Sequence, residues 1–128
     1  ISYIGHADAV KPAFSVSENV GFWAEMNGSK GHTPEQAMTS LGIAHLADLS
    51  ARYLSAGQRR RVNLCRMLTS GADLWLLDEP TTALDSETSA SLGELIAAHR
   101  HKGGMVVIST HTDLGISDAV SLPLEVTR

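Results

Sequence analysis

Short unbroken apolar runs along this 128-residue chain alternate with sets of apolar residues at helical spacing. The runs LWLL at 74–77 and MVVI at 105–108 are typical of strands buried on both faces of a parallel sheet. The chain opens on the alternating sequence ISYIG, which predicts a third strand. The segment from Leu122 to Val126 is a weaker candidate for an edge strand, because Pro123 cannot donate a backbone hydrogen bond.

Two capping boxes predict helices between the first strand and the LWLL run. Ser15 with Glu18 begins one helix, and Thr33 with Gln36 begins the next. One face of the first helix carries Val16, Val20, Trp23 and Ala24, and the apolar side of the second carries Met38, Leu41, Leu46 and Leu49. The glycine-rich turn at 27–31 separates the two helices.

A further helix is predicted after the LWLL run. Asp85 or Ser86 is positioned to cap it, and Gly103-Gly104 ends it. Its apolar side contains Leu92, Leu95, Ile96 and the half-buried edge residue His99. Helices alternating with runs of this kind predict an α/β fold built on a parallel sheet.

Composition excludes several classes of protein. Hydrophobic residues make up 43% of the chain and charged residues 19%, which is typical of a globular protein with a core. No apolar run approaches the roughly 20 residues that a membrane-spanning helix needs. The net charge of −4 argues against nucleic acid as the main ligand. Cys65 is the single cysteine, so no internal disulfide can form, and its apolar neighbours predict a small buried side chain.

The pair Asp78-Glu79 is the first candidate site. It directly follows the LWLL run, and ligands bind at the carboxyl ends of strands in open α/β sheets. Two adjacent carboxylates there suit a hard cation and a polarised water. Ser109-Thr110-His111 lies at the same edge if the two strands are neighbours. The alternative is that the carboxylates only begin a solvated turn before Pro80.

The LSAGQ segment at 54–58 is the second candidate site. Ser55 can cap a helix that begins with Ala56, Gly57 and Gln58, and its first backbone N–H groups can then meet an anion. Gly57 allows a ligand to approach the backbone. The arginines at 59–61 follow, and a solvated basic face is the expectation for at least one of them.

Together, LSAGQ, LWLLDEPTTALD and the later His111 resemble the ATP-binding cassette (ABC) family, in which LSGGQ is the signature motif. The resemblance implies a partial P-loop NTPase (ABC ATPase) fold with a parallel-sheet core and a helical subdomain. It implies that Asp78 binds Mg²⁺ and Glu79 polarises the attacking water. His111 would form the switch, and Asp85 would lie in the D-loop. Ser55, Gly57 and Gln58 would bind ATP. Ala56 stands where the usual motif has Gly, and a single methyl group is not expected to abolish function.

The same resemblance implies that residues 1–128 are only part of a nucleotide-binding domain. Residues from about 12 to 52 would form the helical subdomain, with the signature helix starting near 55; residues 1–6 and about 70–128 would form the α/β core. No G-x-x-x-x-G-K-[ST] phosphate loop occurs in the sequence, so we expect a C-terminal portion of a longer subunit that is inactive alone. His6 stands where most family members have Gln, and would bind nucleotide, water or, as a neutral imidazole, a metal. It could also merely end a strand.

A finer resemblance covers most of the chain. YIGHADAVKP, LADLSARYLSAGQRRRVNLCRML and STHTDL are similar to the ATP-binding subunits of the haem exporter in bacterial cytochrome c biogenesis. That subfamily implies ATP and Mg²⁺ as cofactors, and permease subunits and a second nucleotide-binding subunit as partners. It also implies a peripheral location at the cytoplasmic face of the inner membrane.

Three other hypotheses remain open from the sequence. A non-transport cassette ATPase could act on nucleic acid or ribosomes, although the acidic net charge and the lack of a basic tail argue against it. Another ABC transporter would also fit, since the signature and Walker B motifs recur across many of them. A non-catalytic interaction module is the third possibility, because the phosphate loop is not in this sequence.

Overall fold

The computed structural model describes residues 1–5, 8–110 and 120. They form a three-stranded parallel sheet in the order β1-β2-β3, with strands β1 (Ser2–Ile4), β2 (Leu74–Asp78) and β3 (Met105–Ser109). The helices are α1 (Val16–Met26), α2 (Pro34–Ser40), α3 (Ala56–Thr69) and α4 (Ser86–His101), with short 3-10 turns at Ala44–Leu46 and Ala51–Tyr53. The predicted α/β class and the three strands are therefore confirmed.

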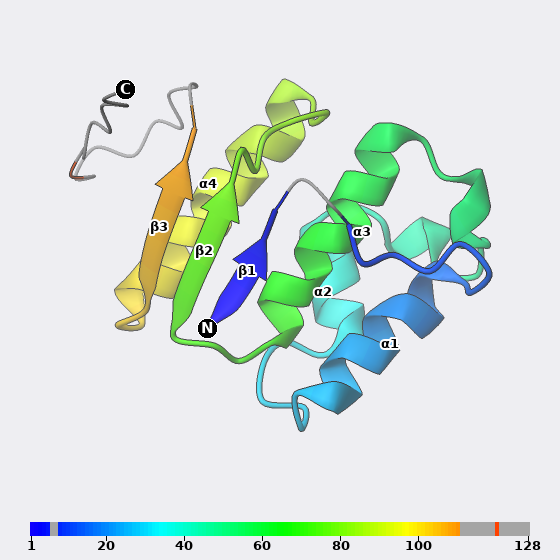
Figure 1. Cartoon of the computed structure of the whole chain (residues 1–128), viewed down its shortest axis with the longest axis horizontal. Coiled ribbons are helices and arrows are strands. Elements are labelled where there is room, and N and C mark those ends of the chain that lie inside the picture. The colour runs from blue at the N-terminus through cyan, green and yellow to red at the C-terminus, as the bar shows by residue number, and fades with distance from the viewer. Residues whose placement is uncertain (6–7, 111–119, 121–128) are drawn as a thin grey trace, which may run out of the picture.

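One face of the sheet packs against helices and the other is largely open. Figure 1 shows α4 behind β2 and β3, while α3 lies beside β1. Ile4, Trp75 and Leu77 are buried in the core on the covered side. On the opposite side Tyr3, Met105 and Val107 remain 59%, 60% and 58% exposed.

The prediction that LWLL and MVVI are buried on both faces is wrong for the described structure. Burial alternates along β2, where Leu74 and Leu76 are only partly buried, and along β3, whose Met105 and Val107 are exposed. The physical reason is that α3 and α4 supply apolar side chains to one face only. An unbroken apolar run therefore did not distinguish a strand covered on one face from one covered on both.

The capping predictions are confirmed. Ser15 caps α1 and Thr33 caps α2, each in a complete capping box with Glu18 or Gln36. Asp85 is the residue that caps α4, and Lys102 and Gly103, with a positive φ of 92° at Gly103, follow the last helical residue.

The apolar side assigned to α2 is partly wrong. The helix ends at Ser40, and Gly42 turns the chain with a φ of 68°. Met38 and Leu41 are buried as expected, but Leu46 belongs to a separate 3-10 turn and Leu49 is 36% exposed. Because α2 ends at Ser40, Leu46 and Leu49 could not lie on the apolar face of this helix. The division of the chain into a helical subdomain and an α/β core stays a prediction.

Helix α3 is central to the packing. It contacts α1 and α2 on one side and β1 on the other. Val62, Leu64 and Cys65 are fully buried within the core, as predicted for the cysteine. Because α3 begins near the carboxyl ends of the strands and runs back along the sheet (Figure 1), its first turns lie at the edge where ligands bind in α/β folds.

Helix α4 is fastened to the sheet by an aromatic stack. The rings of His99 and Trp75 lie 3.7 Å apart at 10° to each other. The Nε2 atom of His99 also lies 2.9 Å from the Asp73 carbonyl oxygen. Gly104, which lacks a side chain, leaves room for the imidazole. Within the described part of the chain, none of the helices is both long and apolar enough to cross a membrane.

Candidate functional site

The two predicted strand ends meet at one edge of the sheet. Asp78 is the last residue of β2 and pairs in register with Ser109 of β3. Immediately beyond it, the Glu79 backbone N–H donates to the Ser109 carbonyl oxygen at 2.7 Å. Both carboxylate residues are partly buried. The structure therefore confirms that β3 ends beside the carboxylate pair.

The backbone of Glu79 adopts a left-handed conformation with a φ of 47°. Such a conformation is uncommon for a residue other than glycine, and it costs about 1–2 kcal/mol. Tight turns follow, in which Thr82 N–H donates to the Glu79 carbonyl and Leu84 N–H to the Thr81 carbonyl. Ala83 is also left-handed, with a φ of 64°. The chain thus leaves the sheet through a compact loop with two unusual backbone positions.

The N-terminus of α3 is organised by a capping box. Ser55 Oγ accepts from Gln58 N–H at 3.1 Å, and Gln58 Oε1 accepts from Ser55 N–H at 2.9 Å. Ser55 and Ala56 are exposed, so this end of the helix faces solvent. The first N–H groups of a helix have no intrahelical acceptor, and the helix dipole favours an anion beside them.

The loop after Glu79 contacts α3 and then begins α4. A Cβ atom at Gly57 would lie 2.8 Å from the Ala83 carbonyl oxygen, so glycine permits this approach. Asp85 follows and accepts from Thr88 N–H at 2.7 Å as the N-cap of α4. Its hydrogen bonds with Thr88 hold the pKa of Asp85 below its ordinary value, and the Arg61 charge lowers it further.

The three arginines after the LSAGQ segment have different environments. Arg59 lies 3.9 Å from the Asp8 carboxylate and donates to the Ala51 carbonyl. Arg60 is only 9% exposed and donates to the carbonyls of Gly5, Asp78 and Glu79. Burial lowers the pKa of Arg60, and the Asp78 charge opposes that shift. Arg60 is therefore not solvated, whereas Arg59 and Arg61 are only partly buried, so the expectation of a solvated basic face for at least one of the three is not contradicted.

Sequence reasoning assigned Arg60 no function, although a signal was present. Leu64 and Met67 follow it at helical spacing of four and seven residues, and both are fully buried. The same periodicity places Arg60 on the buried side of α3. An arginine on that side requires acceptors within the protein.

Two predicted site residues cannot be placed. His6 and His111 lie outside the described residues, as does the candidate strand from Leu122 to Val126. Their predicted roles at the carboxylate pair stay predictions.

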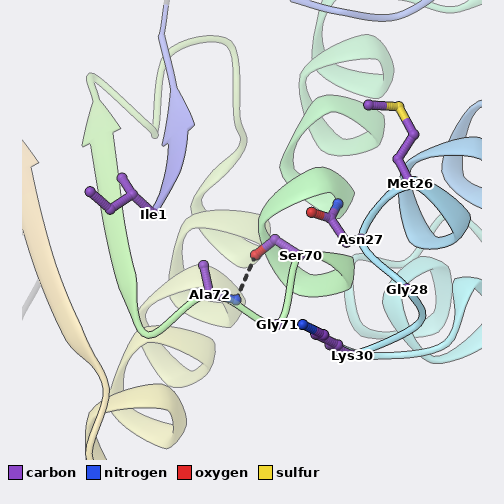
Figure 2. Close-up of a pocket in the computed structure, with 8 residues that line it drawn as sticks. All are labelled: Ile1, Met26, Asn27, Gly28, Lys30, Ser70, Gly71 and Ala72. Atoms are coloured by element: carbon purple, nitrogen blue, oxygen red, sulfur yellow. Dashed lines mark hydrogen bonds between the residues drawn. The ribbon is translucent and has the colours of Figure 1, made fainter.

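A separate pocket opens at the other end of the strands. Figure 2 shows its lining around Ile1, Lys30 and Ala72, with Ser70 Oγ accepting from the Ala72 N–H at 3.1 Å. Its volume is about 480 Å³. Ile1 and Ala72 precede β1 and β2, whereas Asp78 and Glu79 are at the opposite ends of the strands. The pocket therefore lies away from the candidate site and contains none of its residues.

The donor chemistry of the carboxylate pair fits Mg²⁺. This ion prefers oxygen ligands and usually takes one or two carboxylates, with water and phosphate oxygens completing its shell. Asp78 and Glu79 can provide such oxygens at the sheet edge. In the described ranges no cluster of three or more His, Cys, Asp or Glu residues could hold a metal by itself. A magnesium ion here would therefore need further oxygen ligands, such as water or phosphate, beside these carboxylates.

The chain belongs to the ABC transporter family, whose sequence profile matches residues 1–82. It is 49% identical over 123 residues to the cytochrome c biogenesis ATP-binding export protein CcmA of Rhodospirillum rubrum, covering 96% of this chain and 53% of that protein. It is 44% identical over 124 residues to the protein of the same name from Paracoccus denitrificans, covering 97% and 58%. The chain thus spans about half the length of these relatives.

A solved structure supports the same fold. The chain superposes on a metal-chelate type ABC transporter in an inward-facing conformation with a TM-score of 0.65 and 26% sequence identity. The match covers 86% of this chain and 47% of the other. The fold predicted from the sequence is therefore confirmed as part of an ABC ATPase fold.

Proposed function

We propose that this chain is part of the ATP-binding subunit of an ABC transporter that exports haem or a related ligand for cytochrome c biogenesis. The family match and the names of the relatives, which describe cytochrome c biogenesis ATP-binding export proteins, support this assignment. The observation that supports it most is that carboxylates at the end of β2 and a capped helix N-terminus occur in one unit, with the helix packed on the loop after the carboxylates.

In this proposal the carboxylate pair serves the nucleotide of its own subunit. Asp78 would hold Mg²⁺, which neutralises charge on the phosphates when ATP is bound. Glu79 would accept a hydrogen bond from the attacking water and orient it as a general base. His6 and His111 would contact the same nucleotide. Residues 1–6 and about 70–128 would belong to the α/β core.

The N-terminus of α3 would serve the nucleotide of a second subunit. Ser55, Gly57 and Gln58 would contact its γ-phosphate through a hydroxyl, a backbone N–H and an amide. Asp85 would lie in the loop at the junction between the two subunits. Two copies of the subunit would then close face to face around two nucleotides, and residues 1–128 alone would not complete a site.

The permease subunits would be driven by this closure and reopening. Residues from about 12 to 52, which include α1 and α2, would form the helical subdomain that contacts them. The complete subunit would be peripheral, at the cytoplasmic face of the bacterial inner membrane. Nucleic acid has no part in this proposal.

Complementation tests the assignment. The complete subunit containing this chain is expressed in a bacterium that lacks its own cytochrome c biogenesis ATP-binding protein, and c-type cytochromes are measured by haem staining. We expect the wild type to restore them and Glu79→Gln to fail at equal expression. ATP hydrolysis by the purified subunit without restoration would reject the haem-export assignment and favour another ABC transporter. No hydrolysis by the assembled transporter would reject the ATPase assignment as well.

A further inference from the structure

The guanidinium group of Arg60 joins the ends of two strands to one helix. Its Nη1 atom donates to the Gly5 carbonyl at 2.8 Å, at the end of β1. Its Nη2 atom donates to the carbonyls of Asp78 at 3.2 Å and Glu79 at 2.9 Å, at the end of β2. Bonds from a charged donor are stronger than neutral ones, particularly where water is excluded.

Arg60 holds one side of the strained Glu79 backbone. The Glu79 carbonyl accepts from Arg60, while the Glu79 N–H donates to the Ser109 carbonyl at 2.7 Å. The left-handed φ of 47° is therefore fixed by a bond on each side of the residue. A conformation of this kind persists only when surrounding contacts enforce it. The direction of the Glu79 side chain depends on that backbone conformation.

The position of Arg60 on α3 gives the contact a second consequence. It lies in the second turn of the helix that begins at Ala56 and is capped by Ser55. Gly57, in the first turn, packs on the Ala83 carbonyl in the loop after Glu79. A displacement of this end of α3 would therefore be transmitted directly to the backbone that carries Glu79.

We propose that Arg60 is a positioning residue that holds Glu79 in its catalytic direction and couples it to the N-terminus of α3. The inference rests on the proposed ATPase function. If α3 binds the nucleotide of a second subunit, Arg60 carries the position of that helix to the carboxylate that serves the first. Its role requires a guanidinium with several donors, because a lysine ammonium cannot reproduce the planar fork.

Arg66 provides a matched control on the same helix. It is partly buried and donates to the Tyr3 carbonyl of β1 at 3.4 Å, and it lies 5.8 Å from the centre of the Trp23 ring. Like Arg60, it has a buried Nε atom without a hydrogen-bond partner among the described residues. It joins α3 to β1, and neither of these contacts involves Glu79 or the loop that follows it.

The experiment compares Arg60→Gln, Arg60→Lys and Arg66→Gln in the complete subunit assembled with its permease partners. We expect Arg60→Gln to lower kcat about 10–100-fold with a smaller change in the KM for Mg-ATP, since misplacing a reacting group reduces rate strongly. Arg60→Lys should recover part of that loss. Arg66→Gln should lower the melting temperature about as much as Arg60→Gln does, but it should leave kcat within about twofold of the wild type.

A double-mutant cycle with Glu79→Gln separates positioning from general destabilisation. If Arg60 acts through Glu79, adding Arg60→Gln to Glu79→Gln should reduce the residual rate by less than about twofold. A full additional 10-fold loss would show that Arg60 acts elsewhere and would overturn the inference. If Arg60→Gln does not fold, Arg60→Lys is carried through the same cycle.

The outcome also distinguishes this inference from the proposed function. If wild type hydrolyses ATP, Glu79→Gln does not, and both Arg60 variants match wild type in kcat, the inference fails and the ATPase assignment stands. If wild type hydrolyses no ATP, the proposed function fails first. A loss of kcat in Arg66→Gln equal to that in Arg60→Gln would show that any buried arginine of α3 has the same effect, and would also reject the positioning role.

Discussion

Gly57 packs against the carbonyl oxygen of Ala83, at a distance where a Cβ atom on residue 57 would lie only 2.8 Å from that oxygen. The contact joins the first turn of α3 to the loop that follows the carboxylate pair. Ala83 itself has a positive φ of 64°, so its carbonyl cannot move without changing an already unusual backbone. The neighbouring Ala56, in contrast, is exposed.

The first prediction is that position 57 does not tolerate alanine in place of glycine, whereas position 56 tolerates glycine in place of alanine. Gly57→Ala should push the Ala83 carbonyl away, destabilise the fold by about 1–3 kcal/mol and lower ATPase activity. Ala56→Gly should keep activity near that of the wild type, because it removes only an exposed methyl group and costs at most about 1 kcal/mol of helix stability. For both variants of the complete subunit, steady-state hydrolysis measures the ATPase activity and urea unfolding measures the stability. Equal activity of the two variants would contradict the steric explanation.

The second prediction separates the capping role of Ser55 from its proposed role in binding nucleotide. Ser55→Ala and Ser15→Ala each remove the hydroxyl of a complete capping box, so each should cost about 1 kcal/mol of stability. Only Ser55→Ala should strongly reduce ATPase activity, because Ser15 caps α1 instead. Thermal unfolding and phosphate release are measured for both. A matching loss of activity in Ser15→Ala would assign the effect to stability alone.

The caps and strand ends were predictable because their causes are local. Ser15, Thr33 and Asp85 begin helices where their side chains can accept backbone N–H groups, and Ser109 meets Glu79 because parallel neighbouring strands end at one edge. These relationships follow from spacing along the chain. The proposed roles of Glu79 and Asp85 toward a nucleotide, in contrast, come from the family resemblance.

The remaining features depend on tertiary contacts. The alternating exposure of β3 depends on which helices reach the sheet, and the early end of α2 depends on a single glycine turn at Gly42. The contact between Gly57 and Ala83 joins residues 26 positions apart, and the bond from Arg60 to Gly5 joins residues 55 apart. Only the helical spacing of Arg60 with Leu64 and Met67 could have indicated its burial.

The third prediction concerns pH. The pKa of Asp85 lies below its ordinary value of 3.8 in the folded chain, chiefly through its hydrogen bonds with Thr88. Its charge therefore stabilises the fold fully above about pH 4, and this contribution is lost as pH falls through the lowered folded pKa. Asp85→Asn keeps a good cap without the charge. The wild type should have the higher urea midpoint at pH 6, and the difference should vanish at low pH; a constant difference would contradict it.

The fourth prediction concerns Cys65. Burial raises the pKa of its thiol far above the ordinary value, and the side chain is fully buried. Iodoacetamide should therefore leave Cys65 unmodified in the native subunit at pH 8 and label it in urea, as followed by mass spectrometry of the peptide that contains it. Rapid labelling of native protein would show that α3 opens readily. An exposed cysteine introduced at Ala56 provides the positive control for the reagent.

The last prediction tests the carboxylate at the centre of the proposed mechanism. Glu79→Gln keeps the size of the side chain but removes its ability to accept a proton, so hydrolysis should fall about 10²–10⁴-fold while ATP still binds. The complete subunit should then accumulate as a closed, ATP-bound dimer, detectable by size-exclusion chromatography with light scattering. Glu87→Gln, an exposed change in the first turn of α4, is the control and should hydrolyse ATP like the wild type. Undiminished hydrolysis by Glu79→Gln would show that Glu79 is not the general base, because a glutamine side chain cannot accept the proton.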